Sequence, residues 1–232
     1  YKSEKIVSIG PSFGINIYSL FQTIYFSIKN YIKSYHRIDN KRKFFSDYKA
    51  QYLRPKLKDY YPGQLKKDYI YFVASLWKKE RQTNNYRANF IKSCLSKNIE
   101  FEGGFAPRTK NDISGFENLT MSKRDKMENY IKKTKNSIFV FNTPAVLNCH
   151  GWKLAEFMCF GKAILSTKIS RKLPKELKNE EHILITDGTL LDINNKLDKL
   201  LENKSLIKKL SENSRTYFEE ELHPIQVIKS LD

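Results

Sequence analysis

A single carboxylate on a short helix has the clearest chemical potential in this sequence. Glu156 lies about one turn into the apolar stretch 152–160, which begins after Gly151 and stops at Gly161. A carboxylate at this position can accept hydrogen bonds from a ribose diol, as acidic residues do in doubly wound nucleotide-binding folds. The free N–H groups and positive dipole end of the same helix can bind a phosphate group without a metal.

Two short apolar runs flank this helix and must position it. Residues 137–141 are rich in β-branched and aromatic side chains, which is typical of a strand buried on both faces. Thr143 and Pro144 end that run, and residues 163–167 return to the composition of a strand. The helix therefore starts just beyond the carboxyl end of a strand, which is the layout of a nucleotide-sugar pocket. An ordinary turn followed by a solvated glutamate is the alternative interpretation.

The order of residues around Glu156 resembles the signature of the retaining, metal-independent glycosyltransferases of family 4 and their GT-B relatives. That signature has two spaced glutamates, a glycine between them, and then glycine, proline and a hydrophobic strand. Glu156 matches the second glutamate, and Gly151 matches the glycine that lets the backbone approach the sugar phosphate. Asn148 replaces the first glutamate, and Ala163 replaces the proline. The run from His150 to Glu156 is similar to a variant found in bacterial surface-polysaccharide glycosyltransferases.

The resemblance implies an enzyme, a hexosyltransferase that moves a sugar from a nucleoside diphosphate sugar to a glycan or lipid-linked glycan acceptor in surface-polysaccharide biosynthesis. It implies that Glu156 binds the donor ribose. The expected diphosphate ligands at the start of the helix are Gly151, Trp152 and Lys153, and the expected catalytic residues beside the sugar are Asn148 and His150. Replacement of an acid by Asn148 leaves the donor sugar and the stereochemistry open. No cofactor or metal is expected, since the nucleotide sugar is a substrate.

Basic residues follow the strand expected over residues 68–74. In the GT-B family this region carries cations that meet the donor phosphates. A cation there would neutralise the diphosphate leaving group as the glycosidic bond breaks, which is the electrostatic role that a metal plays elsewhere. The candidates are Lys78, Lys79, Arg81 and Arg87. A solvated basic loop is the alternative.

The remaining patterns alternate between strand and helix. Residues 99–105 indicate a second strand that ends in a glycine pair, and the resemblance places Gly104 near the nucleotide base. A basic helix is expected over 122–135, a strand over 183–186, and helices over 192–201 and 205–218. This alternation predicts an α/β fold, a Rossmann-like doubly wound parallel sheet that corresponds to a GT-B C-terminal domain, with a partial second domain.

The expected domain organisation has three parts. Residues 1–66 are basic and aromatic and are interpreted as a partial N-terminal, acceptor-side segment, with a strand and glycine turn over 5–14 and an apolar helical stripe from Ile17 to Ile32. Residues 67–222 form the donor-binding domain. Residues 223–232 are expected to be a cross-over helix that returns to the first domain. A short acceptor-side segment favours a fragment or a divergent enzyme.

The net charge and its distribution limit the classes of partner that the sequence predicts. The formal net charge is +17, yet the basic residues are spread along the chain and no nucleic-acid-binding motif is visible, so a specific nucleic-acid partner is not expected. The basic, aromatic segment 25–61 favours attraction to an anionic membrane surface. Solvated surface charge is the alternative.

Cysteine, histidine and hydropathy patterns bear on the location. The three cysteines, Cys94, Cys149 and Cys159, lack metal-ligand spacing and fit buried, reduced thiols, and the histidines form no zinc motif. No apolar run reaches the ~20 residues needed to span a bilayer. We therefore expect a cytoplasmic protein, peripheral at the inner face of the membrane, with no metal site.

Two rival functions remain open. A GT-B-related sugar-nucleotide epimerase would share the fold and the nucleotide site, but it would hydrolyse or epimerise the nucleotide sugar without an acceptor. A non-catalytic basic module would bind an anionic membrane or nucleic acid through charge alone. Its affinity would fall steeply with salt and would be unaffected by loss of Glu156.

Overall fold

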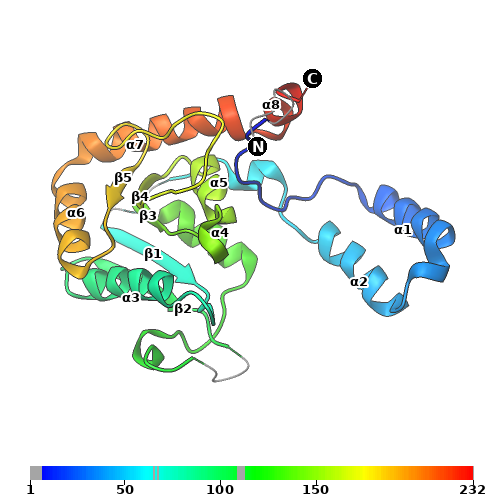
Figure 1. The fold of residues 1–232 in the computed structure, drawn as a ribbon, viewed down its shortest axis with the longest axis horizontal. Coiled ribbons are helices and arrows are strands. Elements are labelled where there is room, and N and C mark those ends of the chain that lie inside the picture. The colour runs from blue at the N-terminus through cyan, green and yellow to red at the C-terminus, as the bar shows by residue number, and fades with distance from the viewer. Residues whose placement is uncertain (1–6, 65, 67, 109–112, 232) are drawn as a thin grey trace. The chain divides into compact units, whose positions relative to one another are not determined.

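The computed structural model describes residues 7–64, 66, 68–108 and 113–231. The chain divides into two compact units, a smaller one formed by Phe13–Tyr61 and a larger one formed by Tyr1–Ser12 with Pro62–Asp232. Figure 1 shows the elements of both.

The smaller unit is a pair of helices. Its elements are α1 (Leu20–Ser34), the 3-10 helix η1 (Tyr35–Arg37), α2 (Lys41–Tyr52) and the 3-10 helix η2 (Leu57–Tyr60). Ser19 begins α1 through a capping box with Gln22, in which each side chain satisfies a backbone N–H that the first turn leaves free. Asn40 caps α2 in a similar way, because its Oδ1 accepts from Lys43 N at 2.9 Å.

The helix α1 confirms the expected helical stripe, but the stripe faces solvent. The buried positions of α1 are the polar residues Thr23 and Ser27, whereas Phe21 is 83 % exposed and Ile32 is 68 % exposed. The prediction of a strand within 5–14 is wrong for the described part of that range, because residues 7–14 form no strand. No neighbouring strand pairs with them there, and an unpaired extended segment leaves its backbone groups without ladder hydrogen bonds.

The larger unit contains the remaining elements of the chain. These are β1 (Tyr69–Ala74), α3 (Arg81–Leu95), β2 (Glu100–Phe105), η3 (Glu117–Leu119), α4 (Met127–Asn136), β3 (Phe139–Asn142), η4 (Val146–Asn148), α5 (Trp152–Cys159), β4 (Ala163–Thr167), β5 (Leu184–Thr186), α6 (Leu190–Glu202), α7 (Lys204–Tyr217), the π-helix η5 (Phe218–Leu222) and α8 (Pro224–Lys229). The expected α/β alternation is confirmed.

All strand pairs of the larger unit are parallel. The strands β1 and β2 form one sheet, and β3, β4 and β5 form a second in that order. The sheets meet at β1 and β3, where Ile138 N donates to Tyr69 O at 2.9 Å and Tyr71 N donates to Ser137 Oγ at 3.0 Å. The resulting order is β2-β1-β3-β4-β5, so the chain reverses its direction of winding between β1 and β3. Doubly wound sheets bind ligands at such a switch point, beyond the carboxyl ends of the strands.

Helices cover both faces of the strands. The helices α3 and α6 lie side by side (Figure 1), and their apolar residues share one core cluster with Phe72, Phe141 and Leu165. On the other face, Tyr130 of α4 lies against Tyr71 of β1, with 6.2 Å between ring centroids. Burial on both faces explains why the strands are apolar along their length rather than alternating.

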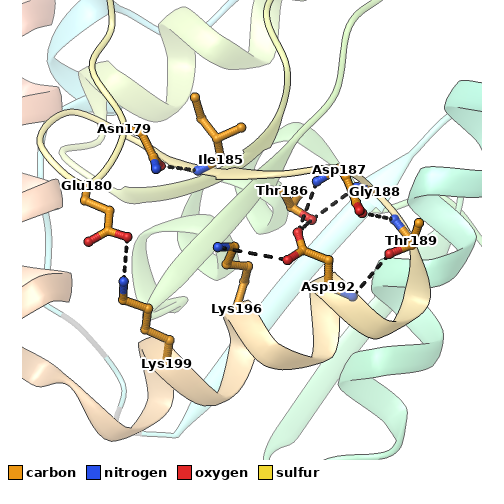
Figure 2. Close-up of polar contacts among 10 residues, drawn as sticks. All are labelled: Asn179, Glu180, Ile185, Thr186, Asp187, Gly188, Thr189, Asp192, Lys196 and Lys199. Carbon is orange, nitrogen blue, oxygen red and sulfur yellow. Dashed lines mark hydrogen bonds and ion pairs between the residues drawn. The ribbon is translucent and has the colours of Figure 1, made fainter.

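A polar network fixes the turn between β5 and α6, as Figure 2 shows. Asp192 Oδ2 accepts from Thr186 Oγ1 at 2.6 Å and from Asp187 N at 3.1 Å. Thr189 caps α6 by accepting from Asp192 N at 3.2 Å. The turn also contacts α3, because Asn89 Nδ2 donates to Gly188 O at 3.0 Å. The network therefore ties the end of β5 to the helix that follows β1.

Several details differ from expectation. The glycine pair lies inside β2, which continues to Phe105. Gly103 and Gly104 both have positive φ, and an added Cβ on Gly103 would lie 1.8 Å from Phe72 O of β1. The helix α4 begins at Met127 rather than at residue 122. Cys149 is exposed rather than buried, while Cys94 and Cys159 are buried. Among the described helices, none has the length and hydropathy of a membrane span.

Candidate functional site

A cavity of about 420 Å³ lies at the switch point. Its floor is aromatic: Phe72 of β1 and Phe141 of β3 line it, and Phe90 stacks on Phe141 beneath, with 4.4 Å between centroids. Polar and basic groups reach the cavity from the loops after β1 and β3 and from the start of α5. Its full lining is Phe72, Ala74, Ser75, Trp77, Arg87, Phe141, Asn142, Thr143, Ala145, His150, Gly151, Trp152 and Lys153. The volume is typical of small-molecule sites.

The N-terminus of α5 opens onto this cavity. Gly151 is the N-cap residue, with extended backbone and no side chain to bond the first N–H groups. Those groups and the helix dipole favour an anion. Both Trp152 and Lys153, the first two helical residues, line the cavity with Gly151. The three residues expected at the start of the helix are thus brought together.

Lys153 carries a positive charge into apolar surroundings. Its Nζ donates to Val73 O and lies 5.6 Å from the Phe72 ring centroid and 5.5 Å from that of Tyr130. Burial lowers the pKa of Lys153 to about 8, Glu156 opposes the decrease, and Arg87 adds to it. A bound anion would favour the charged form of this amine.

Arg87 is the second cation of the cavity. It is 8 % exposed, and its Nε donates to Thr143 Oγ1 at 2.9 Å while Nη1 donates to Ser75 O at 2.7 Å. Burial lowers the pKa of Arg87 to about 10, with Glu80 offsetting part of the decrease. The guanidinium therefore stays charged at neutral pH, and it joins the ends of β1 and β3.

Glu156 lies one turn after Lys153 and is 8 % exposed. Its Oε2 accepts from the Tyr130 hydroxyl at 2.8 Å. Burial raises the pKa of Glu156, and the hydrogen bond from Tyr130 and the charge of Lys153 offset part of the rise. Glu156 is not among the residues that line the cavity. The structure thus places it beside the site, in contact with α4.

Two tryptophans line the cavity from different elements. Trp152 is 65 % exposed, which leaves its ring available to a ligand. Trp77 follows β1 and is held by Asn84, whose Oδ1 accepts from Trp77 N at 3.0 Å and whose Nδ2 donates to Trp77 O at 2.8 Å. The Trp77 Nε1 atom is buried and has no hydrogen-bond partner among the described residues.

The turn before α5 holds the two expected catalytic residues. Asn148 ends η4 with a φ of 57°, which asparagine tolerates better than most residues. The turn is anchored because Leu147 N donates to Glu80 Oε1 at 2.9 Å. His150 lines the main cavity, and Asn148 and His150 line a small adjoining hollow of about 10 Å³.

The other expected residues do not meet at this cavity. Lys78 and Arg81 line a separate cavity of about 460 Å³ beside α3, and Lys79 is exposed and lines neither of the two. Gly104 is buried inside β2, where an added Cβ would lie 2.5 Å from Leu119 O. Its small size therefore serves the close approach of the backbone at Leu119.

Sequence reasoning missed several residues of the site. Asn142, Thr143 and Ser75 line the cavity, and Tyr130 bonds Glu156. The first three directly follow or end apolar strands, and polar residues at the carboxyl ends of parallel strands are a signal of a ligand site. The contact of Tyr130 with Glu156 across 26 residues had no such signal.

Comparison with known proteins gives a fold assignment. No protein-family profile and no curated protein matches the sequence. Among solved structures, 72 % of the chain matches 97 % of the C-terminal domain of a glycosyl transferase group 1 family protein, LpcC from Francisella tularensis, with a TM-score of 0.50 and 15 % identity. TarM matches 74 % of the chain with a TM-score of 0.52 and 12 % identity, and the match spans 36 % of TarM.

These likenesses establish the fold as α/β with parallel strands, of the kind found in GT-B C-terminal domains. Identities of 15 and 12 % support a shared fold but do not establish a shared activity. The chemistry of the cavity must therefore carry any functional conclusion.

Proposed function

We propose that this protein is a glycosyltransferase and that the larger unit binds a nucleoside diphosphate sugar at the β1–β3 switch point. One observation carries the proposal: the cavity of about 420 Å³ combines the N-terminus of α5 with the half-buried cation Lys153 and the buried cation Arg87. Two fixed positive charges and a helix dipole in an apolar surrounding match the charge of a diphosphate.

The proposed reaction uses these groups on the leaving group. The bond between the sugar C1 and the phosphate oxygen breaks, and the diphosphate keeps the electron pair. The acceptor hydroxyl oxygen bonds to C1, and its proton passes to the leaving phosphate oxygen if configuration is retained. Lys153 and Arg87 stabilise the charge that develops on the diphosphate, which is a role that needs no metal.

The proposed positions of the substrate parts follow from the lining. The sugar lies near His150 and Asn148, next to the helix start, where Trp152 offers an exposed ring. Glu156 is proposed to bind the ribose, as the matching glutamate of family 4 does. Its buried position beside Lys153 also supports a second role, because its charge favours the protonated amine.

The proposed acceptor is a glycan or lipid-linked glycan of a surface polysaccharide, and the enzyme is placed at an anionic membrane. The exposed apolar face of α1 and the basic residues beside it support that placement. Phe21, Ile24, Ile28 and Ile32 are each at least 47 % exposed, and the first turn of α1 has no acidic residue. Such a helix can lie in the interface of an anionic bilayer.

Calorimetric titration tests the donor site. UDP, GDP, dTDP and CMP are titrated into the wild type and into the Lys153→Met and Glu156→Gln variants at moderate salt. The proposal expects one nucleotide to bind the wild type, with at least about tenfold weaker binding after loss of Lys153. Loss of Glu156 should weaken binding of the ribonucleotide more than that of its 2′-deoxy analogue.

Two outcomes would contradict the proposal. If a folded wild type binds none of the nucleotides, the donor site is absent. If a nucleotide sugar binds and is epimerised or hydrolysed without any acceptor, as followed by proton NMR, the enzyme is an epimerase rather than a transferase.

A further inference from the structure

Asn142 is a buried amide at the carboxyl end of β3. It is 4 % exposed, pairs with Ser166 of β4 in the sheet register, and lines the main cavity at the switch point. It also lines the small hollow shared with Asn148 and His150. Asn142 thus lies where the proposed donor meets the turn before α5.

The hydrogen bonds around Ser166 fix which way the amide of Asn142 points. Ser166 Oγ donates its single proton to Thr167 O at 2.8 Å, so toward Asn142 it can act only as an acceptor. The group that faces it must therefore be Nδ2, and Asn142 Nδ2 does donate to Ser166 Oγ at 2.9 Å. The carbonyl oxygen, Oδ1, consequently points away from Ser166.

The Asn142 Oδ1 atom is left without a donor. It is buried and has no hydrogen-bond partner among the described residues. Trp77 lines the same cavity, and its indole Nε1 is likewise buried without a hydrogen-bond partner among the described residues. Buried polar groups in native proteins are almost always satisfied, and an orphan group in a site points to a ligand that completes it. Two residues of the cavity lining therefore carry one acceptor and one donor that lack partners among the described residues.

The chemistry of the acceptor restricts what can face it. The diphosphate of a bound nucleotide carries no proton to donate at neutral pH, so it cannot satisfy Asn142 Oδ1 and suits Lys153 and Arg87 instead. A hydroxyl or an N–H group must lie over Asn142. In a nucleotide sugar both the transferred sugar and the ribose are bonded directly to the diphosphate, and both carry hydroxyls. The proposed function assigns the ribose to Glu156, which does not line this cavity, so the transferred sugar is the hydroxyl-bearing part left to face Asn142.

We propose that Asn142 Oδ1 accepts a hydrogen bond from a hydroxyl of the transferred sugar and thereby determines sugar specificity. The inference rests on the proposed function and deepens it, because it assigns the sugar subsite to a residue outside the Glu156 signature. Trp77 Nε1 donates to an oxygen of the same ligand. A site built to bond a hydroxyl discriminates against a ligand that lacks it, since the buried acceptor is then left unpaired.

The test compares each nucleoside diphosphate with its sugar ester. Dissociation constants of UDP, GDP and dTDP, and of their glucose, N-acetylglucosamine and mannose esters, are measured by calorimetry for the wild type and three variants. Asn142→Leu removes the acceptor, and Asn142→Asp keeps an acceptor of the same shape. Thr167→Val is the matched control, because Thr167 Oγ1 is also buried without a partner but Thr167 does not line the cavity.

The expected result is selective. Asn142→Leu weakens binding of the sugar ester by about tenfold while its parent diphosphate binds within about twofold of the wild type. Asn142→Asp and Thr167→Val keep the wild-type ratio between ester and diphosphate. Should Asn142→Leu fail to fold, an Asn142→Asp variant that loses this ratio overturns the proposal.

Other outcomes separate the two levels of inference. Equal weakening of diphosphate and ester places Asn142 on the nucleoside and overturns the sugar assignment. Unchanged binding of both also overturns it. A folded wild type that binds neither diphosphates nor esters overturns the proposed function itself, which is a different observation from a wild type that binds esters without any dependence on Asn142.

Discussion

Arg87 on α3 donates from Nε to Thr143 Oγ1, just past the end of β3, over 2.9 Å inside the protein. Through its second bond, from Nη1 to Ser75 O at 2.7 Å, the same side chain also holds the loop after β1. The two strands that flank the switch point are thus joined by one guanidinium. A residue that shapes the cavity in this way also supplies part of its charge.

Arg87→Lys should lower both stability and diphosphate affinity. A lysine keeps the charge but lacks the planar fork that reaches Thr143 and Ser75 together, so at least one buried acceptor loses its donor. The expected loss is about 1–3 kcal/mol in unfolding free energy, measured by urea denaturation. Arg81→Lys is the matched control, since Arg81 is exposed and does not line this cavity. Equal effects of the two substitutions would contradict this role of Arg87.

Diphosphate binding should weaken as the pH rises through about 8. The pKa of Lys153 is lowered to about 8 in the folded protein, below the value near 10.4 of an exposed lysine, so its charge is lost from the free site above that pH. Calorimetry between pH 6.5 and 9.5 measures the decline. Lys153→Met should bind weakly and with a flatter profile, while Lys79→Met should retain the wild-type profile.

The lowered pKa of Lys153 also predicts how the free energy of unfolding changes with pH. Between pH 8 and about 10.4 the unfolded chain binds more protons at Lys153 than the folded protein does. The contribution of this group to unfolding free energy therefore rises with pH across that window. Urea denaturation at pH 8 and pH 9.5 should show the wild type gaining stability relative to Lys153→Met. A relative loss would mean that the pKa is raised rather than lowered.

Gly188→Ala should destabilise the larger unit. Gly188 has a φ of 84°, and an added Cβ would lie 2.2 Å from Tyr86 Cδ1 of α3. Backbone strain and displacement of the Tyr86 ring should together cost about 1–3 kcal/mol, measured by thermal and urea unfolding. Gly115→Ala is the matched control, because Gly115 has a φ of 89° and no atom of the described residues lies within 4 Å of the added Cβ. A similar loss in both variants would show that the contact with Tyr86 contributes nothing.

Membrane binding should depend on the apolar face of α1. Ile24 and Ile28 are 47 % and 50 % exposed and lie one turn apart, so replacing both by glutamine removes apolar area from one surface. We expect about tenfold weaker co-sedimentation with vesicles that contain anionic lipid. Leu191→Gln, at a 73 % exposed position of α6, should have no effect. Retained binding of the double variant would assign any membrane affinity to charge alone.

Much of the larger unit follows from local sequence. Strand β4 over residues 163–167 and the helix start after Gly151 were predictable because an apolar run between glycines and polar turns leaves few other ways to bury side chains. Short-range patterning sets the period and the ends of each element.

Tertiary structure decided which charges share one cavity. Four basic residues near α3 were equivalent candidates in the sequence, but only Arg87 faces the core side of the helix at the switch point, whereas Lys78 and Arg81 line another cavity. Helical position alone does not tell which loop a side chain will meet, because that depends on how α3 packs against β1 and β3.

The sequence by itself determined the α/β alternation and the glycine-led start of α5 beyond the end of β3, since both depend on residues close together in the chain. Only the fold decided that Glu156 pairs with Tyr130 and that Asn142 presents a free carbonyl oxygen. Burial and the orientation of an amide are set by neighbours distant in sequence, such as Ser166 of the adjacent strand. Hydrogen-bond satisfaction is a property of the packed molecule, and no local pattern encodes it.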